Sequence, residues 1–347
     1  MTLVSVIYGN AYPVIVTDRA ISQKDFSGKV VLPSTGRIPS DNTSVVKFRV
    51  KSVIIKDILC VAFSGILHEI ERLLDDIIDF FLHRDICEAS LKDYLTNMRQ
   101  SVQVSVMFAL GGAEFANNRI MVACSGTWMQ DHSMEKLDIL ATGSGAVEWI
   151  EHFVNTQGYL ESSGDRLTDC LQRALVASIK YIAQEMYSIE QLQDGWGGGF
   201  DIVYYTDGKF HRYDNIAYVF MYAHVEAPEK AKFMSINSNR YLADNAIVLN
   251  IGEDNQPAQC IIPPFRNRFP LDSKEMIVGG YSSDIATCIF INKNDEAMDT
   301  LAILVKGNKS TNEPLFAGAY MDGKFQFGLA PGFKKVVIEA LDFYISG

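Results

Sequence analysis

One residue near the start of the chain has a side chain suited to nucleophilic chemistry. Thr2 directly follows Met1, and an initiator methionine before a small residue such as threonine is normally removed. A threonine hydroxyl is a poor nucleophile at neutral pH and needs a base to accept its proton. An N-terminal threonine carries that base in its own α-amino group, whose reference pKa of about 8 lies near working pH. Thr2 is therefore a candidate nucleophile; the alternative is that it only begins the first strand.

Other kinds of site find little support in the sequence. The histidines show no H-x-x-H or H-x-x-x-H spacing and the cysteines form no C-x-x-C pair, so we expect no metal site. The glycine-rich runs at 143–145 and 195–199 are not followed by the lysine and hydroxyl residue of a phosphate-binding loop, so we expect no nucleotide cofactor. Scattered cysteines in apolar runs are interpreted as buried free thiols, which fits a reducing cytoplasm.

The charge balance narrows the range of partners. The formal net charge is −11 and about half of the residues are hydrophobic, which is the composition of an ordinary globular protein. An acidic chain gains nothing from counterion release on nucleic acid and is not attracted to an anionic membrane surface. The sequence has neither a long apolar span nor the pattern of a secretory signal, so we expect no membrane partner and a cytoplasmic location.

The elements that would position Thr2 are strands followed by helices. Residues 3–8 and 13–17 are apolar runs around Gly9-Asn10, which predicts a β-hairpin. Strands are also predicted at 45–50 and 58–63, with a turn at Lys56-Asp57. Apolar residues at steps of three and four from Ile66 to Phe81 predict an amphipathic helix.

The order of strands followed by helices continues to about residue 213 and then changes. We predict helices at 89–103, 146–156 and 165–188, and strands at 104–110, 119–124, 200–205 and 209–213. After 226 the predictions are mostly strands, at 246–250, 276–280, 286–292, 301–305, 315–321 and 324–329, with one helix at 332–345. The sequence therefore predicts an α+β fold with domains at 1–225 and 226–347, the second smaller and β-rich.

Three stretches in order resemble proteasome β-subunits. They are VVKFRVKSVIIKDILCVAFSGILHEIERLLDDI, FALGGAEFANNRIMVACSGTWMQDHSMEKLDILATGSGA and DGWGGGFDIVYYTDG. The resemblance covers about residues 2–220 and leaves the C-terminal region unmatched. It implies the N-terminal nucleophile hydrolase fold, a four-layer αββα sandwich, and a threonine-type peptidase or amidohydrolase. It also implies a homo-oligomer that acts on peptide or protein substrates.

The resemblance assigns roles around Thr2. Asp18 lies sixteen residues after Thr2, the spacing of the carboxylate in that pattern. Lys47 fits the lysine that would lower the pKa of the terminal amine and stabilise charge on the hydroxyl oxygen, and we prefer it to Lys29 and Lys51. The backbone N–H of Gly65 would stabilise the oxyanion; alternatively, Gly65 only begins the following helix.

Two further residues would hold the amino terminus. Ser144 lies in the Gly-Ser-Gly turn and Asp194 in the later Asp-Gly-Trp loop. Their alternatives are a helix N-cap for Ser144 and an ordinary turn aspartate for Asp194. Gly197 departs from the pattern, which has a serine at that position, and so removes one hydrogen-bond partner.

The resemblance also predicts the substrate pocket. Phe63, two residues before Gly65, would line the pocket for the side chain that precedes the cleaved bond. An aromatic wall disfavours charged groups, so substrates ending in Leu, Phe or Tyr are expected to be preferred. Arg49, on the same strand face as Lys47, would instead admit an acidic side chain if it reached this pocket.

Three interpretations of function remain open. The first is the self-assembled threonine hydrolase. The second is a catalytically inactive structural or regulatory subunit, because the N-terminal strand can also be aligned so that Met1 takes the nucleophile's position and Thr17 that of Asp18. The third is a binding protein in which residues 226–347 recognise a partner.

Overall fold

The structure is a computed structural model of a mixed α+β protein. It describes residues 2–8, 13–23, 25–98, 104–111, 121–125, 130–132, 138–156, 163–254, 256–266, 280–292, 298–307, 313–321 and 324–346. Within these residues no helix has the length and apolar character needed to cross a membrane. The predicted turns at Gly9-Asn10 and Asp322-Gly323 lie outside the described residues, as does Met1.

The first sheet contains the strand that follows Thr2. Its order is β12 (Lys209–Arg212), β11 (Phe200–Thr206), β2 (Val14–Asp18), β1 (Leu3–Tyr8), β10 (Asp138–Gly143) and β9 (Gln130–His132), and all neighbours are antiparallel. The predicted first hairpin is confirmed, because β1 and β2 pair with Val4 opposite Thr17. Both central strands are buried on both faces, which their continuous apolar sequences favour.

A second, four-stranded sheet faces the first. It consists of β5 (Ser52–Ile55), β6 (Leu59–Gly65), β7 (Val104–Leu110) and β8 (Met121–Ser125). A separate pair, β3 (Ala20–Ser22) and β4 (Val45–Phe48), follows β2. Apolar side chains of the two sheets form one buried cluster that includes Val4, Val6, Cys60, Ala62 and Met107.

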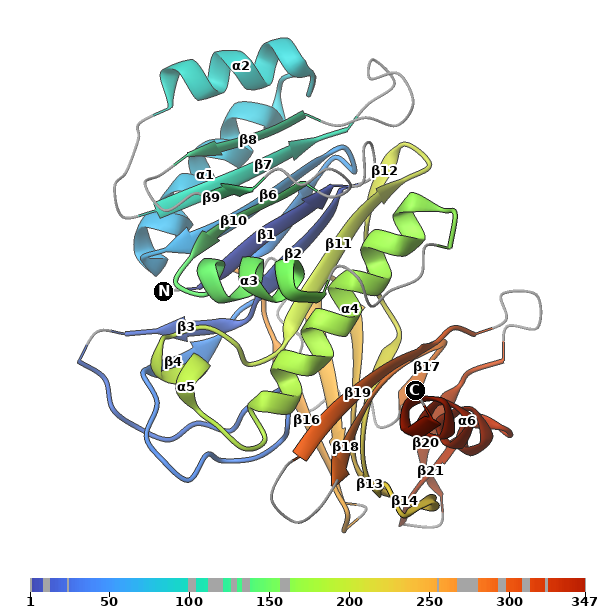
Figure 1. The fold of residues 1–347 in the computed structure, drawn as a ribbon. Helices are drawn as coiled ribbons and strands as arrows, with labels where there is room; N and C mark the ends of the chain where they lie inside the picture. The colour runs from blue at the N-terminus through green and yellow to red at the C-terminus, as the bar shows by residue number, and fades with distance from the viewer. Residues whose placement is uncertain are drawn as a thin grey trace.

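Helices pack on the other side of each of these sheets (Figure 1). The second sheet is covered by α1 (Leu67–Leu82), which is followed by α2 (Glu88–Asn97). Residues Ile70, Leu74, Ile77 and Phe81 form the buried stripe of α1, at the spacing of one helix face. The first sheet is covered by α3 (Ala146–Thr156) and α4 (Arg166–Gln184), and a short α5 (Glu190–Gln193) leads to β11.

The C-terminal part forms a third sheet that lies beside the first (Figure 1). Its order is β16 (Pro257–Ile262), β15 (Asn245–Ile251), β14 (Ala227–Leu242), β13 (Ile216–His224), β18 (Asp284–Asn292) and β19 (Met298–Val305), with β13 and β18 parallel. A three-stranded sheet of β17 (Gly280–Ser282), β20 (Phe316–Met321) and β21 (Lys324–Leu329) follows, and the last element is α6 (Phe333–Ser346).

The change from one sheet to the next comes earlier in the chain than the predicted limit at 225/226. That limit falls between β13 and β14, which are paired neighbours in the third sheet. Helix α4 contacts β18 and β19 as well as β1 and β2, and one buried cluster joins side chains of the first sheet and α4 to Phe220 and Phe290 of the third. The two parts therefore share a core.

Candidate functional site

Thr2 lies at the start of β1 with its hydroxyl between a cation and a carboxylate. Its side chain is nearly inaccessible, since the residue is only 2% exposed. The hydroxyl donates a hydrogen bond to Asp18 Oδ1 and accepts one from Lys51 Nζ. The predicted partnership of Thr2 and Asp18 is therefore present, and its cause is the β1–β2 register, which continues from Val4 opposite Thr17 to bring Asp18 beside Leu3.

The Asp18 carboxylate is fully buried and fully engaged. Oδ1 accepts from Lys51 Nζ at 2.6 Å and from the Leu3 N–H at 2.7 Å. Oδ2 accepts from the N–H of Gly197 at 2.9 Å and of Ala20 at 3.2 Å. Three backbone donors and an ammonium compensate the loss of water around this charge. Asp18 is thus fixed in orientation, and it fixes Lys51 in turn.

The lysine of this site is Lys51, and the prediction of Lys47 is corrected. Lys51 is 1% exposed, precedes β5, and forms a buried ion pair with Asp18. Burial lowers the pKa of the Lys51 ammonium below its ordinary value, although Asp18 acts in the opposite direction. Lys47 lies on β4, paired with Ile21 of β3 and partly exposed.

The register of the next hairpin explains the correction. Ile55 pairs with Leu59 and Ser52 with Ala62, so the turn at Lys56-Asp57 places residue 51 opposite residue 63. The Phe63 N–H accordingly donates to the Lys51 carbonyl at 3.2 Å. Counting residues outward from the predicted turn at Lys56-Asp57 places Lys51 opposite Phe63, two residues before Gly65. The sequence therefore contained the signal that favours Lys51.

The Gly143-Ser144-Gly145 turn packs against the backbone of Thr2. A Cβ on Gly143, whose φ is +102°, would lie 1.9 Å from the Thr2 carbonyl oxygen, so only glycine permits this approach. The Gly145 N–H points at the same oxygen at 3.5 Å. The buried Ser144 hydroxyl has no hydrogen-bond partner within the described part of the chain, and it remains available at this turn.

Gly65 ends β6 on the same side of the molecule. A Cβ on Gly143 would lie 3.1 Å from Ser64 Oγ, which places the Ser64-Gly65 strand end beside the turn that contacts Thr2. Gly65 has a φ of +130°, a backbone conformation that favours glycine. The oxyanion role of its N–H stays a prediction.

The structure does not bring the remaining predicted residues to the hydroxyl. Asp194, predicted to hold the amino terminus, is an exposed C-cap of α5. The contact of that loop with the site comes from the Gly197 N–H, which donates to Asp18. Phe63 is fully buried and packs edge-on against Phe265 at 5.9 Å between ring centroids, so it does not form an open pocket wall. Arg49 is half-buried and donates to the Phe48 carbonyl at 3.0 Å; burial lowers its pKa.

A second buried ion pair lies directly after Asp18. The Arg19 guanidinium donates through Nε and Nη2 to Asp201 Oδ1 at 2.9 and 2.7 Å. Its Nη1 donates to Asn239 Oδ1 at 2.7 Å, and Tyr241 also donates to Asp201. Asn239 and Tyr241 belong to β14 of the third sheet, so this pair ties the site's strand to the C-terminal part.

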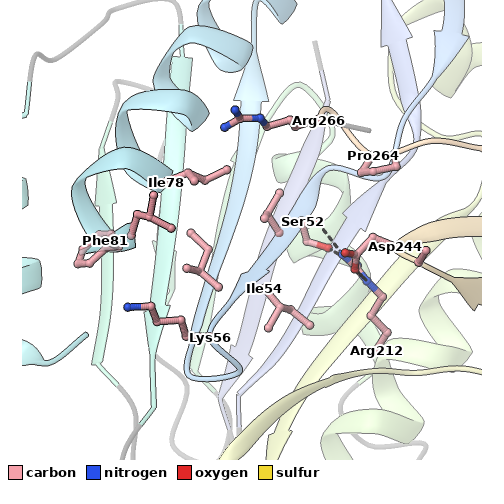
Figure 2. Close-up of a pocket in the computed structure, with 13 residues that line it drawn as sticks. Ser52, Ile54, Lys56, Ile78, Phe81, Arg212, Asp244, Pro264 and Arg266 are labelled. Atoms are coloured by element: carbon pink, nitrogen blue, oxygen red, sulfur yellow. Dashed lines mark hydrogen bonds and ion pairs between the residues drawn. The ribbon is translucent and has the colours of Figure 1, made fainter. Parts of the chain in front are cut away.

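A cavity of about 280 Å³ lies beside β5 (Figure 2). Its walls come from β5, the end of α1 and the turn between β14 and β15, and Arg212 points across it toward Ser52 and Asp244. Thr2, Asp18 and Lys51 do not line it. The cavity is therefore adjacent to the strand of Lys51 but separate from the hydroxyl.

The arrangement at Thr2 is suited to activating a hydroxyl. The Lys51 ammonium faces an oxygen on which negative charge would develop, and a fixed carboxylate orients that ammonium. Among the residues described, no three His, Cys, Asp or Glu side chains gather as metal ligands would. No protein-family model matches the chain, and no curated protein is significantly similar to it in sequence.

Proposed function

We propose that the chain is an N-terminal nucleophile hydrolase of the proteasome type, in which Thr2 becomes the N-terminal residue and attacks an amide or peptide carbonyl. The observation that carries this proposal is the meeting of Lys51 Nζ and the Asp18 carboxylate at Thr2 Oγ1. Thr2 and Asp18 were proposed from the motif resemblance, and Lys51 is proposed from its contacts with both residues.

The arrangement of layers supports the same proposal. Two antiparallel sheets share a buried cluster, while α3 and α4 pack on the first sheet and α1 on the second. The resemblance implies a four-layer helix–sheet–sheet–helix sandwich, and this packing of helices and sheets supports that proposal. Residue Thr2 stands at the end of a central strand, which gives a nucleophile a rigid base.

The proposed reaction uses the groups at Thr2 in a fixed order. The α-amino group of Thr2 takes the hydroxyl proton as Oγ1 bonds to the substrate carbonyl carbon. Lys51 stabilises charge on Oγ1, and the Gly65 N–H would donate to the oxyanion. The amine leaving group departs with the proton, which leaves an ester on Thr2. Water then hydrolyses that ester and restores the hydroxyl.

An inactive relative is the second candidate, and two observations favour it. Thr2 is only 2% exposed, so a substrate would have to reach a nearly closed hydroxyl. Gly197 also offers no side-chain hydroxyl near the site. Under this alternative the buried Lys51–Asp18 pair would only anchor the first strand.

Substitution of the hydroxyl separates the two candidates. Thr2→Ala should reduce hydrolysis of fluorogenic peptides at least about a thousandfold, as loss of a nucleophile does in related chemistry. Thr2→Ser keeps a hydroxyl and should recover much of the activity. Ser5→Ala removes another buried hydroxyl from β1 and should leave the rate unchanged. Wild-type protein without activity, or Thr2→Ala with full activity, would favour the inactive subunit.

The proposal includes self-assembly and a reducing, cytoplasmic setting. In the part of the chain that the structure describes, Cys60, Cys170, Cys260 and Cys288 are free thiols, which suits such a compartment. Helix α1 leaves Leu82 52% exposed, and Ile66 at its N-cap is 41% exposed, so its ends are candidates for contact with another copy. Light scattering at micromolar concentration should give a mass above 38.7 kDa; a monomer mass alone would contradict self-assembly.

A further inference from the structure

Glu185 is a buried carboxyl group beside the site to which the proposed reaction gives no role. It caps the C-terminus of α4 and is 5% exposed. Its Oε1 accepts from the Gly198 N–H at 2.7 Å, and its Oε2 accepts from the Ser34 hydroxyl. Burying a carboxyl group costs free energy that these two hydrogen bonds only partly offset, so its place here calls for an explanation.

The explanation lies in the two consecutive amides that Glu185 and Asp18 share. The Gly197 N–H donates to Asp18 Oδ2 and the next N–H, of Gly198, donates to Glu185 Oε1. The φ angles of Gly197, Gly198 and Gly199 are +112°, +74° and +96°. A run of three such residues is costly in conformational entropy to order, so its shape depends on the groups that hold its N–H donors.

The carboxylate also fills the space beside Gly197. A Cβ at position 197 would lie 2.4 Å from Glu185 Oε1, closer than real side-chain atoms approach. Glu185 therefore stands where a side chain of residue 197 would extend. The absence of a side chain at 197 and the presence of a buried carboxyl at 185 are parts of one local arrangement.

We propose that Glu185 is a positioning residue of the Thr2 site, which holds the Gly197-Gly198 segment so that the Gly197 amide orients Asp18 toward Lys51 and Thr2. This inference rests on the proposed function for its effect on catalysis. The link is short: Oδ2 of Asp18 has two donors, the N–H groups of Ala20 and Gly197. Release of the Gly197 amide removes one of them and weakens the hold on the Oδ2 side of the carboxylate.

The test compares Glu185→Ala and Glu185→Gln with Glu190→Gln in the full chain. Glu190 is exposed at the start of α5 and serves as the control. Glu185→Ala should lower kcat for a fluorogenic peptide about tenfold to a hundredfold, the scale of a small misplacement, with little change in KM. Glu185→Gln keeps an oxygen that accepts from Gly198 and should restore most of kcat. An unchanged kcat in Glu185→Ala would overturn the proposal.

The pH profile gives a readout that a purely structural role would not move. Burial, more than the nearby charge of Asp18, raises the pKa of Glu185 to about 7. The ionised carboxylate accepts from the Gly198 N–H more strongly than the neutral group does, so wild-type kcat should rise by a small step as pH rises through about 7, and that step should be absent from Glu185→Gln, which stays neutral. The same step in both proteins would assign it to another group and contradict the proposal.

Hydrogen exchange tests whether Glu185 holds the Gly197-Gly198 segment, even if no substrate is hydrolysed. Mass spectrometry of peptides covering 194–200 should show faster amide exchange in Glu185→Ala and wild-type exchange in Glu190→Gln. If the wild-type protein hydrolyses no substrate and Glu185→Ala still exchanges faster, the proposed function fails while Glu185 keeps its role in holding the loop. Unchanged exchange in a folded Glu185→Ala protein would reject the role of Glu185 itself.

Discussion

Asp18 and Arg19 are consecutive residues, and each belongs to a buried ion pair, yet the two pairs differ in how fully the cation is satisfied. Arg19 directs its nitrogens to Asp201, Asn239 and Tyr241. Burial lowers its pKa, but Asp201 and Tyr241 outweigh burial and raise it above the ordinary value. Lys51 has Asp18 and the Thr2 hydroxyl as partners, and burial leaves its pKa lowered.

This difference separates a structural pair from a reactive one. A guanidinium with a planar set of donors is suited to a permanent junction, and the Arg19 pair joins the first sheet to β14. An ammonium whose charge is only partly compensated responds to a change on the neighbouring oxygen, and the Lys51 pair contacts that oxygen. Through Arg19, the C-terminal part thus supports β2, the strand that ends at Asp18.

Of the two cations, Lys51 should give the larger loss of activity when it is removed. Lys51→Ala should lower kcat at least about a hundredfold, the lower end for a positioned acid–base group, because Thr2 Oγ1 loses the ammonium that faces it. Steady-state hydrolysis of a fluorogenic peptide measures the loss. Lys47→Ala, on the partly exposed β4, is the matched control and should be close to wild type. A Lys51→Ala enzyme with normal kcat would remove the lysine from the mechanism.

Removal of the structural cation should instead reduce stability. Arg19→Ala leaves Asp201 buried without its cation, which typically costs about 3–5 kcal/mol in the free energy of unfolding. Urea denaturation measures this change. Lys51→Ala should cost less, because Asp18 keeps the N–H donors of Leu3, Ala20 and Gly197.

The exposed Arg37 provides the control for that comparison. Arg37→Ala should stay within about 0.5 kcal/mol of wild type, as surface substitutions usually do. If Lys51→Ala proved more destabilising than Arg19→Ala, the division between a reactive and a structural pair would be wrong.

The sequence predicted the elements whose patterns are regular. The first hairpin follows from two apolar runs around a turn signal, and helix α1 follows from its 3.6-residue periodicity. Thr2 and Asp18 follow from their spacing in the motif. The strands β13 and β14 were not predicted. Strand β14 carries the buried residues Asn237, Ser238 and Asn239. Their partners are the Pro33 carbonyl, the Ser282 hydroxyl and the Arg19 guanidinium, respectively. Buried polar residues of this kind resemble a loop in sequence.

The rest of the site depends on contacts between segments far apart in the chain. Lys51 could have been predicted from the sequence, since the hairpin turn at Lys56-Asp57 determines its register. The role of Glu185 could not have been predicted, because no local sequence pattern shows that the end of α4 contacts the Gly197-Gly198 segment. Asp194 was selected by motif alone, and its side chain points to solvent while the amide of Gly197 makes the contact.

The state of the N-terminus tests the central claim most directly. The claim requires that Thr2 carry a free α-amino group in the working protein, since that group is the proposed base. The measurement is the intact mass, with peptide mapping of the first residues, of protein purified from its own cell. The account predicts a chain that lacks one methionine and begins at Thr2. Full retention of Met1 would contradict the catalytic role of Thr2 and favour the inactive subunit.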